Sequence, residues 1–238
     1  MTPYTLYNAD CLDILPTLEP QSVDAVICDP PYGSKKYKTD IALSPCVFAD
    51  WVRRYRTVAI FGYPELLVKW CVQASIIPDE WIAWWPTNKT EGRAQSRLPK
   101  ETEAIAIFGE TPGANNIFRP RVQDKTCLSI TASRGLSAAH ARYGDVWRDP
   151  APGMMFNSHQ RMHPNEKPLS LMERLVVLCT NQGDVVIDPS MGSGTTGHAC
   201  GNLGRRFIGI EKDAEYFNVA QERIATAYAP LRLMEAAV

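Results

Sequence analysis

Four consecutive residues, Asp29-Pro30-Pro31-Tyr32, are of types that could do chemistry at a fixed place. Residues 23–28, of sequence VDAVIC, are mostly apolar and predict a buried strand directly before them. A carboxylate, and a carbonyl held rigidly by proline, could accept the two hydrogens of an exocyclic amine on a nucleobase. An aromatic ring could stack on that base once it has left a duplex. We therefore predict Asp29, Pro30, Pro31 and Tyr32 as catalytic residues; the alternative is a simple turn after a strand.

A glycine-rich stretch, DPSMGSGTT at 188–196, lies between a predicted strand and a predicted helix. Gly192 and Gly194 permit a ligand to approach the backbone closely. Glu211, at the end of the next predicted strand, could accept both ribose hydroxyls of a nucleoside. The stretch lacks the lysine of a P-loop and matches only the bare G-x-G-x-x-G pattern. Because Asp188 would repel a pyrophosphate but attract a cationic amino-acid group, S-adenosylmethionine suits it better than NAD. A nicotinamide-dependent oxidoreductase, and a turn that binds nothing, are the alternatives.

The two motifs together favour methyl transfer. Asp29 and Asp188 should lie at one edge of the sheet, because both end predicted parallel strands. An amine held by Asp29 could attack a sulfonium methyl in line, with catalysis mostly by positioning and preorganised dipoles. Such a step needs no metal, and none is indicated.

The seven cysteines are scattered without C-x-x-C spacing, which argues against zinc and favours a reducing cytoplasm.

Strand and helix patterns alternate along the 238 residues, which predicts an α/β layer fold with a mainly parallel sheet. The length suits one large domain, or one domain with a small insertion. The predicted strands are Thr5–Asn8, Ala25–Asp29, Val58–Gly62, Glu80–Trp85, Ala104–Phe108, Val185–Asp188 and Phe207–Glu211. The predicted helices are Phe48–Tyr55, Pro64–Ala74, Leu169–Thr180, Thr195–Asn202 and Ala214–Tyr228.

Residues 111–162 interrupt this alternation and are rich in Gly, Pro, Asn, Ser and Arg. They carry seven basic and three acidic residues, although the whole chain has a net charge of -1. This local charge is compatible with phosphate contacts and equally with a solvated loop. We predict a catalytic and cofactor-binding domain from 1–110 and 163–238, with 111–162 as an insertion. Candidate DNA-binding residues, there and in two other basic loops, are Lys35, Lys36, Lys38, Lys89, Arg93, Arg97, Arg119, Arg121, Arg134 and Arg142.

The order of the motifs resembles the β-class of amino-methylating DNA methyltransferases, in which the target-amine motif precedes the cofactor motif. DPPY (29–32) comes first, followed by HPNEKP (163–168), DPSMGSGTT (188–196) and FIGIEKDAEYF (207–217). The similarity covers nearly the whole chain except 111–162. It implies a Rossmann-like class I S-adenosylmethionine-dependent methyltransferase fold with a mixed seven-stranded sheet and a circularly permuted motif order. It also implies that 111–162 is a small irregular insertion for target recognition.

The resemblance carries over to a set of cofactor-binding residues that surround the two motifs. They are Asp10, Cys11, Asp29, His163, Pro164, Lys167, Asp188, Pro189, Ser190, Gly192, Gly194, Thr195, Glu211 and Lys212. Ser190 departs from the family, in which Phe or another bulky residue is common, and this could loosen packing against the cofactor. An Asp at the first position of the tetrapeptide usually accompanies N6-adenine methylation, whereas a Ser often accompanies N4-cytosine. We expect adenine, with N4-cytosine as the alternative.

The expected partner is DNA, as a duplex with one base flipped out. RNA or a protein amide as substrate, and a DNA-binding module without activity, are further alternatives. A homodimer and a restriction endonuclease partner are left open by the sequence. No apolar run is long enough to span a membrane, and no leader pattern follows Met1. We therefore expect a cytoplasmic protein, of a bacterium or of a phage acting in the bacterial cytoplasm.

Overall fold

The computed structural model describes residues 2–19, 21–32, 44–86, 102–114, 146–149 and 166–235. Within them, eight strands form one mixed sheet in the order β1-β8-β7-β2-β3-β5-β4-β6. The strands are β1 Tyr4–Asn8, β2 Ala25–Cys28, β3 Thr57–Gly62, β4 Glu80–Pro86, β5 Glu103–Gly109, β6 Val146–Asp149, β7 Val185–Asp188 and β8 Arg206–Glu211. β5 runs antiparallel to both its neighbours, and the other pairings are parallel. The predicted Rossmann-like α/β fold is confirmed, but the predicted count of seven strands is wrong.

The eighth strand, β6, comes from the segment that we predicted to be irregular. It pairs in parallel with β4, with Ala83 opposite Val146 and Trp84 opposite Trp147. Trp147 is buried in the core, and the guanidinium of Arg174 lies 4.8 Å from the centre of its ring. A four-residue strand among Gly and Arg residues gives almost no periodic signal. Burial of one large aromatic side chain is enough to fix it at the sheet edge.

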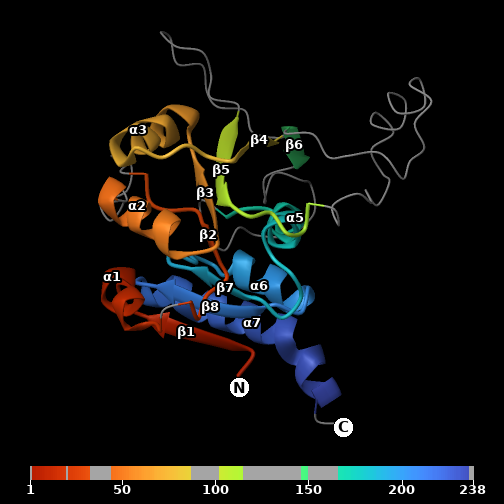
Figure 1. The fold of residues 1–238 in the computed structure, drawn as a ribbon. Coiled ribbons are helices and arrows are strands. Elements are labelled where there is room, and N and C mark those ends of the chain that lie inside the picture. Colours follow the sequence, from red (N-terminus) through yellow and green to blue (C-terminus); the bar gives the residue numbers. More distant parts are fainter. Residues whose placement is uncertain are drawn as a thin grey trace, which may run out of the picture.

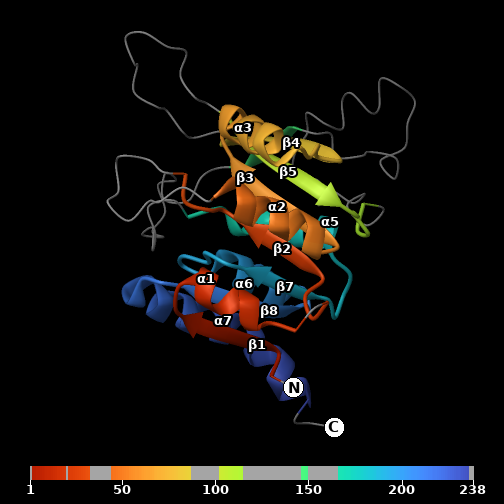
Figure 2. The ribbon, with the colours of Figure 1, turned by 60° about the vertical axis from the view of Figure 1, so that its left-hand side comes forward.

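Helices cover the two faces of the sheet as separate layers (Figures 1 and 2). One face carries α1 (Cys11–Ile14), the 3-10 turn η1 (Leu15–Thr17), α2 (Pro45–Arg54) and α3 (Pro64–Ala74), and the other carries α5 (Leu169–Cys179), α6 (Thr195–Asn202) and α7 (Ala214–Glu235). On the α2 and α3 side of the sheet, Phe48, Trp51 and Leu67 lie in the hydrophobic core. On the α5, α6 and α7 side, Leu171, Leu175 and Ile224 lie in a second core. No helix in the described ranges is long and apolar enough to cross a membrane.

The helix boundaries differ from prediction where local signals were weak or misleading. α2 begins at Pro45 rather than Phe48, because the hydroxyl of Ser44 caps it by accepting from the Cys46 amide. α7 continues to Glu235 instead of ending at Tyr228, so Pro230 lies inside a helix that proline would ordinarily end. The short α1 was not predicted at all. Each of these differences lies at a helix end or in a single turn.

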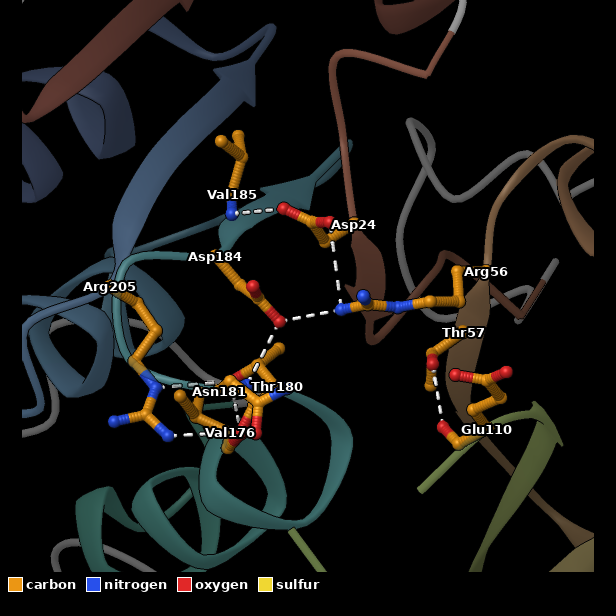
Figure 3. Close-up of polar contacts among 10 residues, drawn as sticks. All are labelled: Asp24, Arg56, Thr57, Glu110, Val176, Thr180, Asn181, Asp184, Val185 and Arg205. Atoms are coloured by element: carbon orange, nitrogen blue, oxygen red, sulfur yellow. Dashed lines mark hydrogen bonds and ion pairs between the residues drawn. The ribbon is translucent and has the colours of Figure 1, made fainter. Parts of the chain in front are cut away.

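An ion-pair network joins β2, β3 and β7 at their amino ends (Figure 3). The Arg56 guanidinium lies 2.5 Å from the Asp184 carboxylate and 3.5 Å from that of Asp24. Asp24 also accepts a hydrogen bond from the Val185 amide at 2.8 Å, and Asp184 accepts from the Asn181 amide at 2.9 Å. The two carboxylates are thus fixed beside one cation. The network holds the strands in register from the edge opposite to the functional residues described below.

Replacing Arg56 with Met should lower the free energy of unfolding by about 1–2 kcal/mol, since two fixed carboxylates lose their shared cation. Urea unfolding checks this value. The matched control is Arg54→Met, because Arg54 forms an exposed ion pair with Asp50 on α2. We expect the control to cost less than about 0.5 kcal/mol. Equal losses in the two variants would contradict a structural role for the network.

Candidate functional site

Asp29 directly follows β2, and the ends of β2 and β7 lie side by side as predicted, with Val26 opposite Ile187. The hydroxyl of Tyr32 donates a hydrogen bond to Oδ1 of Asp29, and Lys167 Nζ donates to Oδ2 at 2.5 Å. Both oxygens of the carboxylate therefore have fixed partners, while the side chain keeps 21% of its surface exposed. The Asp29 carboxylate is oriented from two sides and still reachable by a substrate.

Lys167 is buried between two carboxylates. Its Nζ also lies 3.2 Å from Oε2 of Glu103, and it sits over the rings of Phe61 and Trp84 at 5.1 and 5.7 Å from their centres. Burial alone would lower the pKa of Lys167, but Asp29 and Glu103 raise it above its ordinary value. Burial raises the pKa of Asp29, and Glu103 adds to this, whereas Lys167 opposes both. The cation is therefore permanent, and it favours the ionised form of Asp29.

The ring of Tyr32 stands beside that of Tyr63, which follows β3. Their centres are 5.5 Å apart and their planes are tilted by 60°. Burial raises the pKa of the Tyr32 phenol well above its ordinary value, so the group remains a hydrogen-bond donor to Asp29. These two rings form an aromatic wall next to the Asp29 carboxylate, on which a planar base could stack.

The glycine-rich loop is held tightly between β7, β8 and α7. Gly194 has a φ of +79° and precedes α6, and a Cβ atom there would lie 2.9 Å from Cβ of Ala220. The amide of Gly192 donates to Oε2 of Glu211 at 2.9 Å, and the amide of Met191 donates to the Ile210 carbonyl at 3.0 Å. Glycine at 194 is thus required both by the backbone angle and by the close approach of α7.

The two acids of the cofactor motif organise this loop. Asp188 is 3% exposed and accepts hydrogen bonds from the Ser190 amide at 3.1 Å and from the Thr196 hydroxyl at 2.6 Å. Burial raises its pKa to about 7. Glu211 accepts from the Asp213 amide at 2.8 Å, in addition to Gly192, and burial raises its pKa too. We predicted Asp188 to face a cationic ligand, and the structure shows its two oxygens bonded to the loop itself.

Ser190 joins the glycine-rich loop to the end of β2 and to Asp29. Its hydroxyl donates to the backbone carbonyl of Asp29 at 3.2 Å and lies 3.3 Å from Sγ of Cys28. The serine hydroxyl is therefore a polar link between the glycine-rich loop and the segment that follows β2.

Removing this link with Ser190→Ala should lower kcat for the proposed methyl transfer about three- to tenfold, since a net hydrogen bond contributes about 1 kcal/mol. The KM for the cofactor should change less than about threefold. Ser190→Thr keeps the hydroxyl and should recover most of the rate. A steady-state comparison of the three proteins checks this, and an unchanged kcat in the alanine variant would show that the link has no catalytic role.

The first turn after β1 lies at the same edge of the sheet. Asp10 caps α1 by accepting from the Leu12 amide at 3.0 Å, and it forms an ion pair with Lys212 at 2.9 Å. Burial raises the pKa of Cys11 to about 11, so it stays a neutral thiol. Asn8 donates to the Glu211 carbonyl at 2.9 Å. The structure thus brings Asp10, Cys11, Lys212 and Glu211 to one end of the sheet.

Several residues at the site were not predicted from the sequence. Arg223, on α7, donates to the Ser193 carbonyl at 3.3 Å and to the Thr195 hydroxyl at 3.1 Å, and it pairs with Glu166 at 2.8 Å. It fastens the glycine loop to the segment that carries Lys167. Glu103 and Tyr63 were missed as well. For Glu103 the sequence offered one signal, which is an acidic residue at the start of the otherwise apolar β5.

Some predicted residues lie outside the described part of the chain. These are His163 and Pro164 of the cofactor set, and all ten DNA-binding candidates: Lys35, Lys36, Lys38, Lys89, Arg93, Arg97, Arg119, Arg121, Arg134 and Arg142. Their roles stay predictions.

Known proteins resemble this chain over almost all of its length. A family model described as DNA methylase matches residues 23–222. The type II methyltransferase M2.DpnII of Streptococcus pneumoniae is 48% identical over 237 residues, which cover 92% of this chain and 88% of that protein. M.HpaI of Haemophilus parainfluenzae, also a type II methyltransferase, is 31% identical over 242 residues, which cover 94% and 74%. The crystal structure of the M1.HpyAVI–SAM complex has a TM-score of 0.62 and 26% identity, and the match covers 93% and 98% of the two chains.

Proposed function

Because the chain belongs to the DNA methylase family, we propose that it transfers the methyl group of S-adenosylmethionine to the N6 amine of adenine in DNA. One observation carries this proposal: Asp29 is held at the end of β2, next to the glycine loop that follows β7. A reacting amine and a cofactor bound at these neighbouring strand ends would lie within contact of each other. The complex of M1.HpyAVI with SAM supports this choice of cofactor.

The residues on the cofactor side fit a nucleoside that carries an amino-acid group. Glu211 is partly exposed at the end of β8, and a carboxylate there suits two ribose hydroxyls. Asp10 and Cys11 stand beside it, and the loop from Asp188 to Thr195 would take the amino-acid end. When bound, the cofactor supplies an electrophilic methyl on a sulfonium. Arg223 and Ser190 then keep the loop in place relative to Asp29.

Asp29 and the Pro30 carbonyl would accept the two hydrogens of the adenine amine. This would direct the nitrogen lone pair toward the methyl group and hold the amine in line for attack. As the N–C bond formed, the S–C bond of the sulfonium would break, the demethylated cofactor would leave as a thioether, and one amine hydrogen would be lost to solvent as a proton. Tyr32 and Tyr63 would bind the face of the flipped base, so that catalysis consists of positioning and fixed dipoles. A buried carboxylate beside a permanent cation is suited to this task because it remains an acceptor.

Adenine is preferred over cytosine because the tetrapeptide begins with Asp29. The test is transfer of a labelled methyl group to duplex DNA, followed by digestion to nucleosides and mass spectrometry. We expect N6-methyladenine. N4-methylcytosine would reject the adenine assignment and leave the family assignment untouched.

We further propose that the segment between β5 and β6 recognises the DNA target, as part of an insertion spanning 111–162. The pairing of β6 with β4 supports this proposal, because it joins the end of the segment to the same sheet that carries Asp29, with three strands between β6 and β2. Its basic residues would position the DNA backbone, while other residues of the segment would contact base edges.

A further inference from the structure

Lys167 was predicted to bind the cofactor, but in the structure its ammonium forms ion pairs with Asp29 and Glu103. Its side chain is 8% exposed, and the Glu103 side chain beside it is 9% exposed. The ammonium lies between Asp29 and Glu103, at 2.5 and 3.2 Å, over two aromatic rings. A cation with so many fixed partners has little capacity left for a cofactor. The geometry makes Lys167 a partner of Asp29 rather than a part of the cofactor pocket.

We propose that Lys167 and Glu103 are positioning residues that set the charge and the orientation of Asp29. This inference rests on the proposed function, since it explains how Asp29 acts as an acceptor. A carboxylate that loses water is driven to its protonated form, which would donate a hydrogen bond instead of accepting one. The ammonium of Lys167 opposes this, and together with the Tyr32 hydroxyl it fixes the plane of the carboxylate.

Glu103 has the opposite influence on Asp29. It holds Lys167 from the far side and shares its positive charge, so that Asp29 is not fully neutralised. Two carboxylates around one ammonium leave one net negative charge in the buried group. This charge makes Asp29 a stronger hydrogen-bond acceptor than it would be in an isolated ion pair.

Other groups near Asp29 come from each neighbouring element. Cys28 of β2, Tyr32 of the same loop and Asp188 of β7 lie near Asp29 itself. Tyr63 after β3 stands beside Tyr32, and the rings of Phe61 and Trp84 lie beside the ammonium of Lys167. Among the described residues named here, Asp188 is the further carboxyl group; burial raises its pKa to about 7, and its two oxygens accept from the Ser190 amide and the Thr196 hydroxyl. Lys167 and Glu103 are therefore the charged groups through which the ionisation of Asp29 can be tested separately.

The test measures the pH dependence of kcat for methyl transfer in two variants. The rate requires ionised Asp29, so it falls as pH drops through the apparent pKa of the site. Lys167→Met should move this acid limb to higher pH by about one unit or more, because it removes the nearby cation. Glu103→Gln should move it to lower pH, because it removes the competing carboxylate. The dissociation constant for S-adenosylmethionine should change less than about threefold in both.

Controls separate this role from a purely structural one. Lys69→Met and Glu80→Gln remove exposed charges of the same kinds and should leave the limb in place. Lys167→Arg keeps the cation, so the acid limb of its kcat profile should lie closer to that of the wild type than the limb of Lys167→Met does. If Lys167→Met fails to fold, the downward shift in Glu103→Gln carries the test. Carboxyl NMR titration of Asp29 gives the same comparison without turnover.

Two results would overturn the proposal: an acid limb that is the same in all variants, or a loss of cofactor affinity in Lys167→Met as large as its loss of rate. Failure of the proposed function is recognised independently. It appears in wild-type protein, as N4-methylcytosine or as no methylated base, while the opposite shifts of the Asp29 titration can still be observed.

Discussion

Replacing Asp29 with Ala should reduce methyl transfer to DNA by at least about 10³-fold, while S-adenosylmethionine still binds with an affinity within a few-fold of the wild type. The carboxylate and the Pro30 carbonyl are the two acceptors proposed for the amine. Without the carboxylate, the nitrogen lone pair stays delocalised in the ring and no group orients it. The glycine loop and Glu211 remain, so the cofactor site should persist.

The measurement combines single-turnover methyl transfer with calorimetric titration of the cofactor. Truncating Asp29 also removes one partner of buried Lys167, so a second variant must exclude loss of the fold. Asp29→Asn has nearly the same size and keeps one acceptor oxygen, and it should retain more activity than Asp29→Ala. Normal turnover by the alanine variant would reject the mechanism.

Replacing Glu211 with Ala should have the complementary effect. We expect the dissociation constant for S-adenosylmethionine to rise about 100-fold, because hydrogen bonds to a charged group contribute about 1.5–3 kcal/mol. The variant loses the proposed acceptor for ribose and also the anchor of the Gly192 amide. At saturating cofactor, kcat should stay within about tenfold of the wild type, since Asp29 and its partners are untouched.

Calorimetry and the separation of KM from kcat check this prediction. The matched control is Glu215→Ala, which removes an exposed carboxylate from the first turn of α7. It should change neither quantity. Unchanged cofactor affinity in Glu211→Ala would place the ribose elsewhere. A fall in kcat as large as that in Asp29→Ala would mean that the two motifs do not divide binding and catalysis as proposed.

Local patterns were sufficient to predict most of the sheet. Six of the seven predicted strands have strong apolar runs, whereas Thr5–Asn8 does not, and the motifs that follow parallel strands indicate the edge at which the candidate site lies. β6 could not be predicted, because its stability comes from pairing with β4 and from burial of Trp147. Both are tertiary effects without a local period. The end of α7 was mispredicted for a related reason, since Pro230 is accepted within a helix whose first turns are packed in the core.

The site shows the same division between local and tertiary information. Asp29, Asp188 and Glu211 could be predicted because each ends a strand at the carboxyl edge. Glu103, the second partner of Lys167, could not be predicted. It is the first residue of β5, and it reaches the same edge because β5 runs antiparallel to its neighbours. Arg223 lies on a helix whose polar face gives no hint of the loop that it contacts. Contacts between distant segments require the topology, which the motifs do not specify.

The most direct test of the central claim is single-molecule sequencing of DNA from cells that express the protein. We predict N6-methyladenine at one position within a short recognition sequence, and its absence when the cells express Asp29→Ala. N4-methylcytosine in that sequence, or DNA without any new methylated base from cells with folded wild-type protein, would contradict it.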